Sequence, residues 1–526
     1  MLRSRPLRLV LAVALLATGG VILRGYITDD TYIHLRYARH LLERGELAFN
    51  AGDPTYGCTS PLWVLCLALL LKLGVAPLAA PVCLGAASAL LALLLLDAFL
   101  VRLAFRPAWR LPLLLLCAGD AWFVRWTWSG METPLATALL LLLAWPAIAR
   151  GAGQSEGEAA PLPPARWLVW GMACGLAALT RPEFLLLALL AWPWLAWRGQ
   201  RPLVWRAALP AALGGLLTYG VWLLYAWRAF GRLTPATAAA KSYATTLAPA
   251  IVGPSLARSA AQLGATQAPL WLALATLAVL AAATRGRGTG GGGRPGDPPD
   301  AWPRARLVVV GLALTWTAAL VGGYAVKQVW VISRYVSPLS PLLLLAMAIV
   351  AAGLPALPAR WRRWRAAVLL GACLATLGAN GWLLIHRVRP HAVGLARGLR
   401  ECLVPLGQRI ARETPPGAVV ACLDVGALGW ASERRILDLA GLVSPELLGA
   451  GRAQGFAAMV ASGAWLDVAV PDYLVDRTDG PPRWTGRVVR GIGFTPLASC
   501  VMPGLGVTEP QAWTVTLYRL EPASGP

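Results

Sequence analysis

The sequence predicts a polytopic α-helical membrane protein of about eleven transmembrane helices with a C-terminal mixed α/β soluble domain. Two observations predict the membrane part. Of the 526 residues, 57% are hydrophobic and 14% charged, and the apolar residues gather in runs that approach or reach the length of a bilayer span. A third observation predicts the soluble domain: beyond His386, short apolar stretches alternate with glycine, proline and charged residues.

The first apolar run, Leu7–Leu23, predicts a retained transmembrane helix. Because no small-residue cleavage site precedes the charged stretch that follows, the pattern does not favour a signal peptide.

A long loop over residues 25–80 comes next and contains two predicted juxtamembrane helices. Thr31–Glu43 has an amphipathic pattern, and Ser60-Pro61 precedes the apolar stretch Leu62–Leu73, which Lys72 interrupts. We place both flat on the outer leaflet, since Leu62–Leu73 is short for a span. If it crossed the bilayer, every later loop would change sides.

Ten further apolar runs predict the remaining helices of a membrane domain that extends over residues 1–385. They lie at about 79–101, 111–128, 133–149, 167–180, 183–197, 207–228, 269–284, 307–325, 338–354 and 366–385. Between two of them, residues 286–304 are rich in glycine and proline and predict a disordered cytoplasmic linker.

The formal net charge of +22 does not indicate nucleic-acid binding, because the basic residues are distributed along the ends of the apolar runs. With the N-terminus inside, a basic cluster lies at every inner turn, as the positive-inside rule requires, and the C-terminal domain is outside. The clusters include Arg3, Arg5 and Arg8; Arg102, Arg106 and Arg110; Arg198, Arg201 and Arg206; and Arg360, Arg362, Arg363 and Arg365.

Residues 386–526 predict the compact extracytoplasmic α/β domain. Strands are expected at Ala418–Asp424, Arg435–Leu439, Tyr473–Val475 and Trp513–Leu520. Three of the nine cysteines, Cys402, Cys422 and Cys500, fall in this domain. A disulfide is chemically permitted there, but three thiols define no unique pair.

Two adjacent carboxylates, Asp29 and Asp30, directly follow the first helix and are the first candidates for chemistry. One of them could simply cap the Thr31–Glu43 helix, but two exceed what a cap needs. Beside a partly apolar cavity, such a carboxylate can serve as a general base. Alternatively, the pair could hold a divalent cation through oxygen ligands.

Glu132 is the second candidate carboxylate, at the predicted outer start of a helix. Its simpler role is a favourable interaction with the helix N-terminus; its functional role is to face the same cavity as the aspartates. Asp120 lies deeper, and we expect it to form a buried structural pair with a neighbour such as Arg125.

Three cations, Arg181, Lys241 and Arg334, fall at predicted outer helix ends. Any one of them alone would most often be a residue that snorkels to the interface. Together, opposite acidic loops, they predict a clamp for a phosphate or phosphodiester near the membrane surface. In the sequence no GxGxxG motif follows a predicted strand, and there is no P-loop motif, which leaves a nucleotide-driven mechanism without support.

Several motifs together resemble the GT-C fold glycosyltransferases, above all the mycobacterial terminal arabinofuranosyltransferases and their uncharacterised bacterial relatives. The likeness is scattered over most of the chain. It is carried by Asp29-Asp30-Thr31-Tyr32-Ile33, Arg36-Tyr37-Ala38, Phe49-Asn50-Ala51-Gly52, Tyr56-Gly57, Thr59-Ser60-Pro61-Leu62-Trp63, Ser129-Gly130-Met131-Glu132-Thr133, Thr180-Arg181-Pro182-Glu183, Pro235 to Lys241, Ser333-Arg334-Tyr335, Asp424-Val425-Gly426-Ala427 and Asp438-Leu439-Ala440-Gly441-Leu442.

This resemblance implies a multi-pass enzyme of the bacterial cytoplasmic (inner) membrane. It would transfer a sugar, arabinofuranose by the closest likeness, from a polyprenyl-phosphate donor to a cell-envelope glycan, lipid or protein on the outer face. By similarity, Asp29 or Asp30 would be the base or orient the acceptor, and Arg181, Lys241 and Arg334 would neutralise the leaving phosphate. The family usually has asparagine after the proline of the Lys241 segment, whereas Ala236 stands at that position in this sequence.

A transporter or flippase of lipid-linked glycans is the alternative from another class. It predicts charged residues along a path through the midplane and interrupted helices in matching halves. The sequence has no clear inverted repeat, and its candidate charges fall at one edge. Partners common to both hypotheses are membrane lipids and a polyprenyl-linked glycan, with no nucleic acid.

Overall fold

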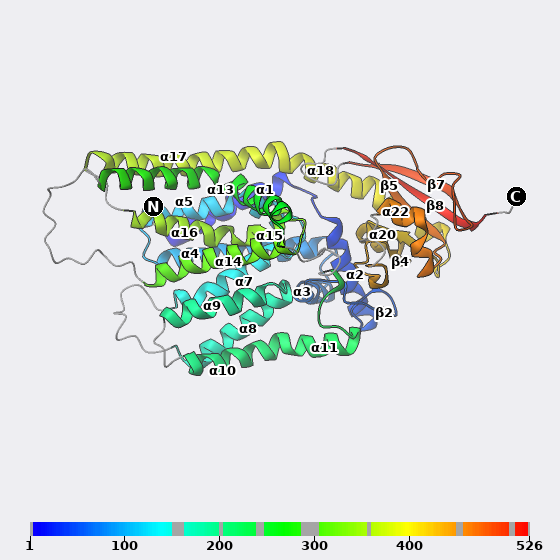
Figure 1. Ribbon diagram of the computed structural model, residues 1–526, viewed down its shortest axis with the longest axis horizontal. Helices are drawn as coiled ribbons and strands as arrows, with labels where there is room; N and C mark the ends of the chain where they lie inside the picture. Colours follow the sequence, from blue (N-terminus) through cyan, green and yellow to red (C-terminus); the bar gives the residue numbers. More distant parts are fainter. Residues whose placement is uncertain are drawn as a thin grey trace.

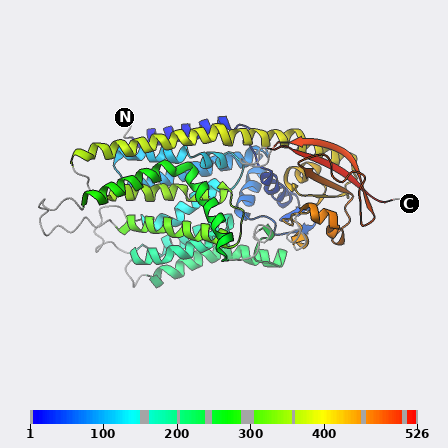
Figure 2. The same cartoon turned by 45° about the horizontal axis from the view of Figure 1, so that its top comes forward.

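The computed structural model describes residues 4–149, 162–198, 204–237, 247–285, 304–354, 359–448, 456–503 and 511–523. It consists of a helical bundle with a sheet-containing C-terminal domain at one end (Figures 1 and 2). The predicted linker at 286–304 lies outside the described residues except for its last position, where a helix begins.

Seven helical segments of the described chain are long and apolar enough to cross a membrane, and the chain is a multi-pass membrane protein. In order, they are α1 (Arg5–Ile22), α4 (Ala79–Arg102), the pair α10 (Val204–Gly215) and α11 (Val221–Phe230) joined by a π-helical turn, α13 (Pro249–Arg285), α14 (Arg304–Val326), the pair α15 (Ser333–Val336) and α16 (Ser340–Gly353), and the segment that begins with α17 (Ala359–Leu383).

The other four predicted spans correspond to shorter helices: α5 (Pro107–Ala118), α7 (Thr133–Ala144), α8 (Pro164–Thr180) and α9 (Phe184–Arg198). The predicted span 111–128 is not continuous, because α5 ends at Ala118 and α6 (Ala121–Thr127) begins after Asp120.

The expected ion pair between Asp120 and Arg125 is wrong. The Asp120 carboxylate caps α6 by accepting from the backbone N–H groups of Trp122 and Phe123, both at 3.0 Å. The Arg125 guanidinium instead donates to the Tyr26 hydroxyl and lies 3.4 Å from the His391 ring. A carboxylate at an open helix start finds backbone donors nearer than a side chain one turn further along.

The loop over residues 25–80 forms α2 (Asp29–Arg44), the short strands β1 (Ala48–Asn50) and β2 (Asp53–Pro54), and α3 (Pro61–Lys72). Gly45 ends α2 in the left-handed conformation, with φ of 71°. The helix packs against α3 on one side and α20 (Val425–Ser432) of the C-terminal domain on the other. Protein therefore covers much of α2.

The last membrane helix continues far beyond residue 385, where the composition predicts its end. After α17 the helical path runs through a π-helical turn (Leu384–Val388), α18 (Arg389–Gly398), a second π-helical turn (Leu399–Leu403) and α19 (Val404–Glu413). The composition changes from apolar to charged near residue 385, but this change does not interrupt the helix. Figure 1 shows this path reaching into the C-terminal domain.

The C-terminal domain is built on one six-stranded mixed sheet in the order β4-β3-β5-β8-β7-β6. β3 (Val419–Cys422) pairs in parallel with β4 (Arg435–Asp438) and β5 (Tyr473–Thr478), and β8 (Trp513–Pro522) then pairs antiparallel with β5 and with β7 (Ile492–Met502). The edge strands are β4 and β6 (Val488–Val489), and α22 (Phe456–Ser462) precedes β5. All four predicted strands are confirmed. β7 went unpredicted because its Pro496 and the bulge beside it interrupt the alternating pattern.

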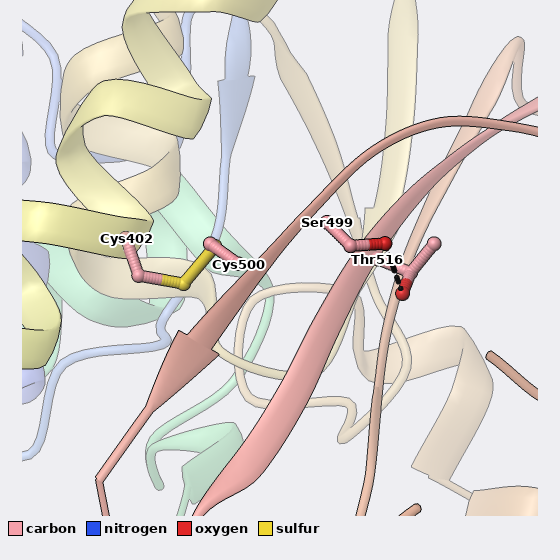
Figure 3. Close-up of a disulfide and its surroundings, with 4 residues drawn as sticks. All are labelled: Cys402, Ser499, Cys500 and Thr516. Carbon is pink, nitrogen blue, oxygen red and sulfur yellow. Dashed lines mark hydrogen bonds between the residues drawn. A yellow bond between two sulfur atoms is a disulfide. The ribbon is translucent and has the colours of Figure 1, made fainter. Parts of the chain in front are cut away.

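One disulfide, Cys402–Cys500, joins the second π-helical turn to β7 (Figure 3). Next to it, the hydroxyls of Ser499 and Thr516 lie 3.0 Å apart across β7 and β8. Cys422, the third candidate thiol, is buried and unpaired at the end of β3. The long helix and the sheet are thus covalently connected.

Candidate functional site

A cavity of about 410 Å³ lies where α2, the C-terminal half of α14 and α15 meet. One wall is apolar and includes Ala319, Leu320 and Gly323 of α14, while Leu442, after β4, reaches the cavity from the C-terminal domain. The charged groups of its lining are Asp30, Glu132 and Glu183 among the acids and Arg181, Lys327 and Arg334 among the bases. Four candidate residues from the sequence therefore share one cavity. Lys241 lies outside the described residues.

Asp30 and Arg334 form an ion pair in the lining of this cavity. Arg334 Nη1 lies 2.6 Å from Asp30 Oδ2. The Asp30 side chain is 39% exposed and the Arg334 side chain is 10% exposed. Arg334 belongs to the short helix α15, whose first residue, Ser333, accepts a hydrogen bond from the Trp126 indole at 2.9 Å. Asp30 is thus the more accessible member of a fixed ion pair.

Glu132 and Arg181 form a second, buried ion pair, with 2.8 Å between Oε1 and Nη2. Glu132 occupies the cap position of α7, where its charge lies at the helix N-terminus as predicted for its simpler role, and its side chain bonds to Arg181 without a capping hydrogen bond. Within the described residues, the Nε and Nη1 atoms of Arg181 have no hydrogen-bond partner, although the Glu183 carboxylate lies 4.0 Å from Nη1. Arg181 is 4% exposed, so these two donors are buried and unused.

Asp29 turns away from the cavity and toward the C-terminal domain. Its carboxylate accepts hydrogen bonds from the backbone N–H groups of Gly426 at 3.0 Å and Ala427 at 2.7 Å. It therefore caps α20, and not α2 as the sequence suggests for one of the pair. Desolvation, followed by the negative charge of Asp424, raises the pKa of Asp29 to about 7. A side chain at position 426 would overlap Asp29, which explains the glycine there.

The Asp29-Asp30 pair does not converge on a common ligand position, since Asp29 bonds to α20 and Asp30 to Arg334. In the described part of the chain, no three His, Cys, Asp or Glu side chains gather as a potential metal site.

Other residues of the same motifs also join the two domains. Arg36 is buried and donates to the carbonyls of Phe49 at 2.7 Å, Gly429, and Arg434 at 2.8 Å. The Asn50 side chain makes two hydrogen bonds of 2.9 Å to the backbone of Ile436. These contacts bind the loop over residues 25–80 to α20 and β4.

Sequence reasoning missed three ionisable lining residues, His34, Tyr324 and Lys327. His34 follows Asp30 by one helical turn, and Tyr324 donates to Glu183 at 2.7 Å. Lys327 ends the apolar run of α14 and forms no ion pair among the described residues. The i,i+4 spacing would have indicated His34, and the rarity of lysine, at positions 72, 241 and 327 alone, would have indicated Lys327.

Comparison with family models matches residues 396–518 to a domain of unknown function, DUF8728. No curated protein matches the chain.

Several solved structures do match. ArnT from Cupriavidus metallidurans, bound to undecaprenyl phosphate, is 12% identical over 98% of both chains, with a TM-score of 0.52. The arabinofuranosyltransferase AftD from Mycobacteria is 18% identical; the match covers 99% of this chain and 40% of AftD, with a TM-score of 0.52. The Archaeoglobus fulgidus oligosaccharyltransferase, tethered with an acceptor peptide, is 12% identical over 88% of this chain and 69% of its own, with a TM-score of 0.51.

All three are GT-C glycosyltransferases. The fold of this chain is therefore the GT-C fold, as the sequence motifs indicate.

Proposed function

We propose that this protein is a membrane glycosyltransferase that transfers a sugar from a polyprenyl-phosphate donor to an acceptor hydroxyl or amide at the outer face of the cytoplasmic membrane. The observation that carries the proposal is the cavity in which Asp30 and the buried, incompletely bonded Arg181 line the same space beside an apolar wall. The GT-C fold agrees with it.

The cationic side of the cavity suits a phosphate. Arg181 Nε and Nη1 have no acceptor in the part of the chain that the structure describes, and a buried donor that stays unpaired is costly. Phosphate oxygens of a bound donor would supply the missing acceptors in charge-assisted bonds. Glu132 holds the other side of the guanidinium and fixes its orientation. Lys327 adds a positive charge that no described carboxylate neutralises.

The apolar wall suits the lipid part of the donor. Ala319, Leu320 and Gly323 belong to α14, which is one of the seven helices able to cross a membrane. A polyprenyl chain lying in the bilayer could therefore place its phosphate beside Arg181 without leaving an apolar environment.

Asp30 is the proposed base, because it lines the cavity while Asp29 caps α20. As the acceptor oxygen or nitrogen bonds to the anomeric carbon, the bond from that carbon to the phosphate oxygen breaks, and the acceptor proton passes to Asp30. The products are the glycosylated acceptor and polyprenyl phosphate. Arg181, Lys327 and Arg334 would stabilise the charge that develops on the leaving phosphate. Lys241 remains a further proposed phosphate ligand.

The finer specificity is also a proposal. AftD is an arabinofuranosyltransferase, which favours arabinofuranose as the sugar, and the acceptor would be a glycan, lipid or protein of the cell envelope. Transport of the lipid-linked glycan draws no support from the cavity, whose lining residues come from the bundle end nearest the C-terminal domain.

The test is a transfer assay with purified protein and a panel of radiolabelled polyprenyl-phosphate sugars. One sugar of the panel should yield labelled acceptor, and Asp30→Asn should lower the rate about 100-fold to 10,000-fold, the usual contribution of a general base. Asp53→Asn, in the same loop and paired with Arg435 at the surface, should transfer at the parent rate. Full activity of Asp30→Asn would rule Asp30 out. Movement of lipid between leaflets without any product would support the transporter instead.

A further inference from the structure

A second, much smaller cavity lies inside the helical bundle and shares no lining residue with the large one. Its volume is about 10 Å³, the space of a single water-sized sphere. Its polar lining consists of Asp120, Thr266, Gln267, Ser340 and Thr376, and all five side chains are nine-tenths or more buried. Three of the candidate membrane spans, α13, α16 and the segment beginning with α17, contribute to it.

Three oxygen atoms around this cavity lack a hydrogen-bond partner among the described residues: Gln267 Oε1, Ser340 Oγ and Thr376 Oγ1. The orientation of the Gln267 amide is determined by its nitrogen, which donates to the Ser340 carbonyl at 3.3 Å; a carbonyl can only accept. The amide oxygen of Gln267 is therefore an acceptor that has no donor among the described residues. Each such atom inside a membrane bundle is expensive unless something occupies the cavity.

Asp120 adds a carboxylate to these oxygens. The described residues provide it with no cationic partner, since Arg125 bonds to Tyr26. Its charge meets the two backbone N–H groups of α6 and the Thr266 hydroxyl, all of them neutral donors. The break between α5 and α6 also brings the C-terminal end of α5 to the cavity, with Leu116 and Cys117 in the lining, and the C-terminal end of a helix carries a partial negative charge. Interrupted helices of this kind hold Na⁺ in membrane proteins.

We propose that this cavity binds one Na⁺ ion, coordinated by the Asp120 carboxylate and the oxygens of Gln267, Ser340 and Thr376. An ion accounts for more than a water molecule does, because it supplies the positive charge that Asp120 lacks as well as a partner for three oxygens. The cavity holds a single small sphere, so it admits one ion, and the proposal is that it selects Na⁺ over the larger K⁺. The ion connects α5, α6, α13, α16 and α17 and stabilises their packing, apart from the transfer site.

The test is thermal unfolding of the purified full-length protein in detergent, with NaCl, KCl or N-methylglucamine chloride at equal ionic strength. The unfolding midpoint should rise with Na⁺ concentration and saturate, while K⁺ and N-methylglucamine should have no such effect. Ser340→Ala and Thr376→Val, which each remove one ligand and shorten or conserve the side chain, should weaken or abolish the rise.

Thr137→Val is the matched control. Thr137 is also a buried membrane-helix threonine, but its hydroxyl already donates to the Thr133 carbonyl at 2.9 Å, so the variant should keep the Na⁺ response. Equal midpoints of the parent in Na⁺ and K⁺ would overturn the proposal and assign the cavity to water. A full Na⁺ response in both Ser340→Ala and Thr376→Val would overturn it as well.

Discussion

Lys327 brings a positive charge into a cavity where Arg181 and Arg334 each already face a carboxylate. A lysine at such a position is a mobile point charge, whereas an arginine presents a fixed fork. In the proposed reaction, Lys327 would therefore follow the phosphate as its bond to the sugar breaks, while the two arginines keep their geometry.

Lys327→Gln should raise the KM for the polyprenyl-phosphate donor by about tenfold to a hundredfold, the value of one hydrogen bond to a charged group. The fold should be unchanged, because Lys327 is exposed and forms no ion pair in the described chain. Steady-state kinetics over a range of donor concentrations measures this. Lys72→Gln, at the exposed end of α3, is the control, and an equal KM in both variants would contradict the assignment.

Asp29 should make stability depend on pH. Its pKa is about 7 in the folded protein, against an ordinary value of 3.8, so between these values the folded state retains a proton that the unfolded chain has lost. Stability therefore declines as pH rises from about 4 to 7. Unfolding midpoints measured over this range should fall more steeply for the parent than for Asp29→Asn. Parallel profiles would show that Asp29 does not titrate in this way.

The candidate residues could be predicted from the sequence, but which of them lines the cavity and which joins the two domains could not. Asp29 and Asp30 are neighbours in the chain, so a pattern of residue types treats them alike. On a helix, adjacent side chains point in different directions, and the rotation of α2 sends one to α20 and the other to the cavity. Whether Asp29 or Asp30 points to the cavity depends on how α2 packs against the C-terminal domain.

At the scale of elements, helix ends were harder to predict than helices. The apolar run at 111–128 is broken at Asp120, and the final helix passes residue 385 and continues to Glu413. Hydrophobicity reports the environment along the chain, whereas helix ends depend on capping and on local hydrogen bonds. A single polar cap inside an apolar run, such as Asp120, hardly changes the average hydrophobicity, so the helix end there goes undetected. After residue 385 the hydrophobicity falls although the helix continues, so the predicted end comes too early.

The Cys402–Cys500 disulfide should stabilise the attachment of the sheet to the long helix. It closes a segment with a sequence separation of 98, and removing such a native crosslink costs about 2–5 kcal/mol. Cys500→Ser should lower the midpoint of denaturant unfolding of the C-terminal domain. Cys83→Ser, at an exposed free thiol, should not. Reductant should lower the midpoint of the parent but not that of Cys500→Ser. If it changes both midpoints by the same amount, the disulfide does not form in the protein.

At the scale of the whole molecule, the sequence pattern predicts most of the architecture. The apolar runs predict the helical bundle, and the alternating stretches after residue 413 predict four of the strands. The contact between the two domains was not readable, because it consists of single polar contacts such as Asp29 to α20 and Asn50 to Ile436. Such contacts join positions nearly 400 residues apart and leave no periodic signal.

The arginine clusters predict one orientation in the membrane, with the N-terminus inside and the C-terminal domain outside. Alkaline phosphatase, which is active only outside the cytoplasm, should be active when fused after Pro526 and inactive when inserted within residues 286–303. The reverse pattern would place the proposed site on the cytoplasmic face. Equal expression of both fusions must be verified by immunoblotting.

The helical path from α17 to α19 has a mechanical consequence. Its 51 residues from Arg363 to Glu413 correspond to about 76 Å of helix, more than twice the thickness of the hydrocarbon core. The C-terminal domain is therefore attached to the bundle by a continuous helix and not by a flexible linker. A lateral force on that domain, such as drag from a polymer in the cell envelope, would be transmitted into the bundle and toward the cavity wall to which Leu442 belongs.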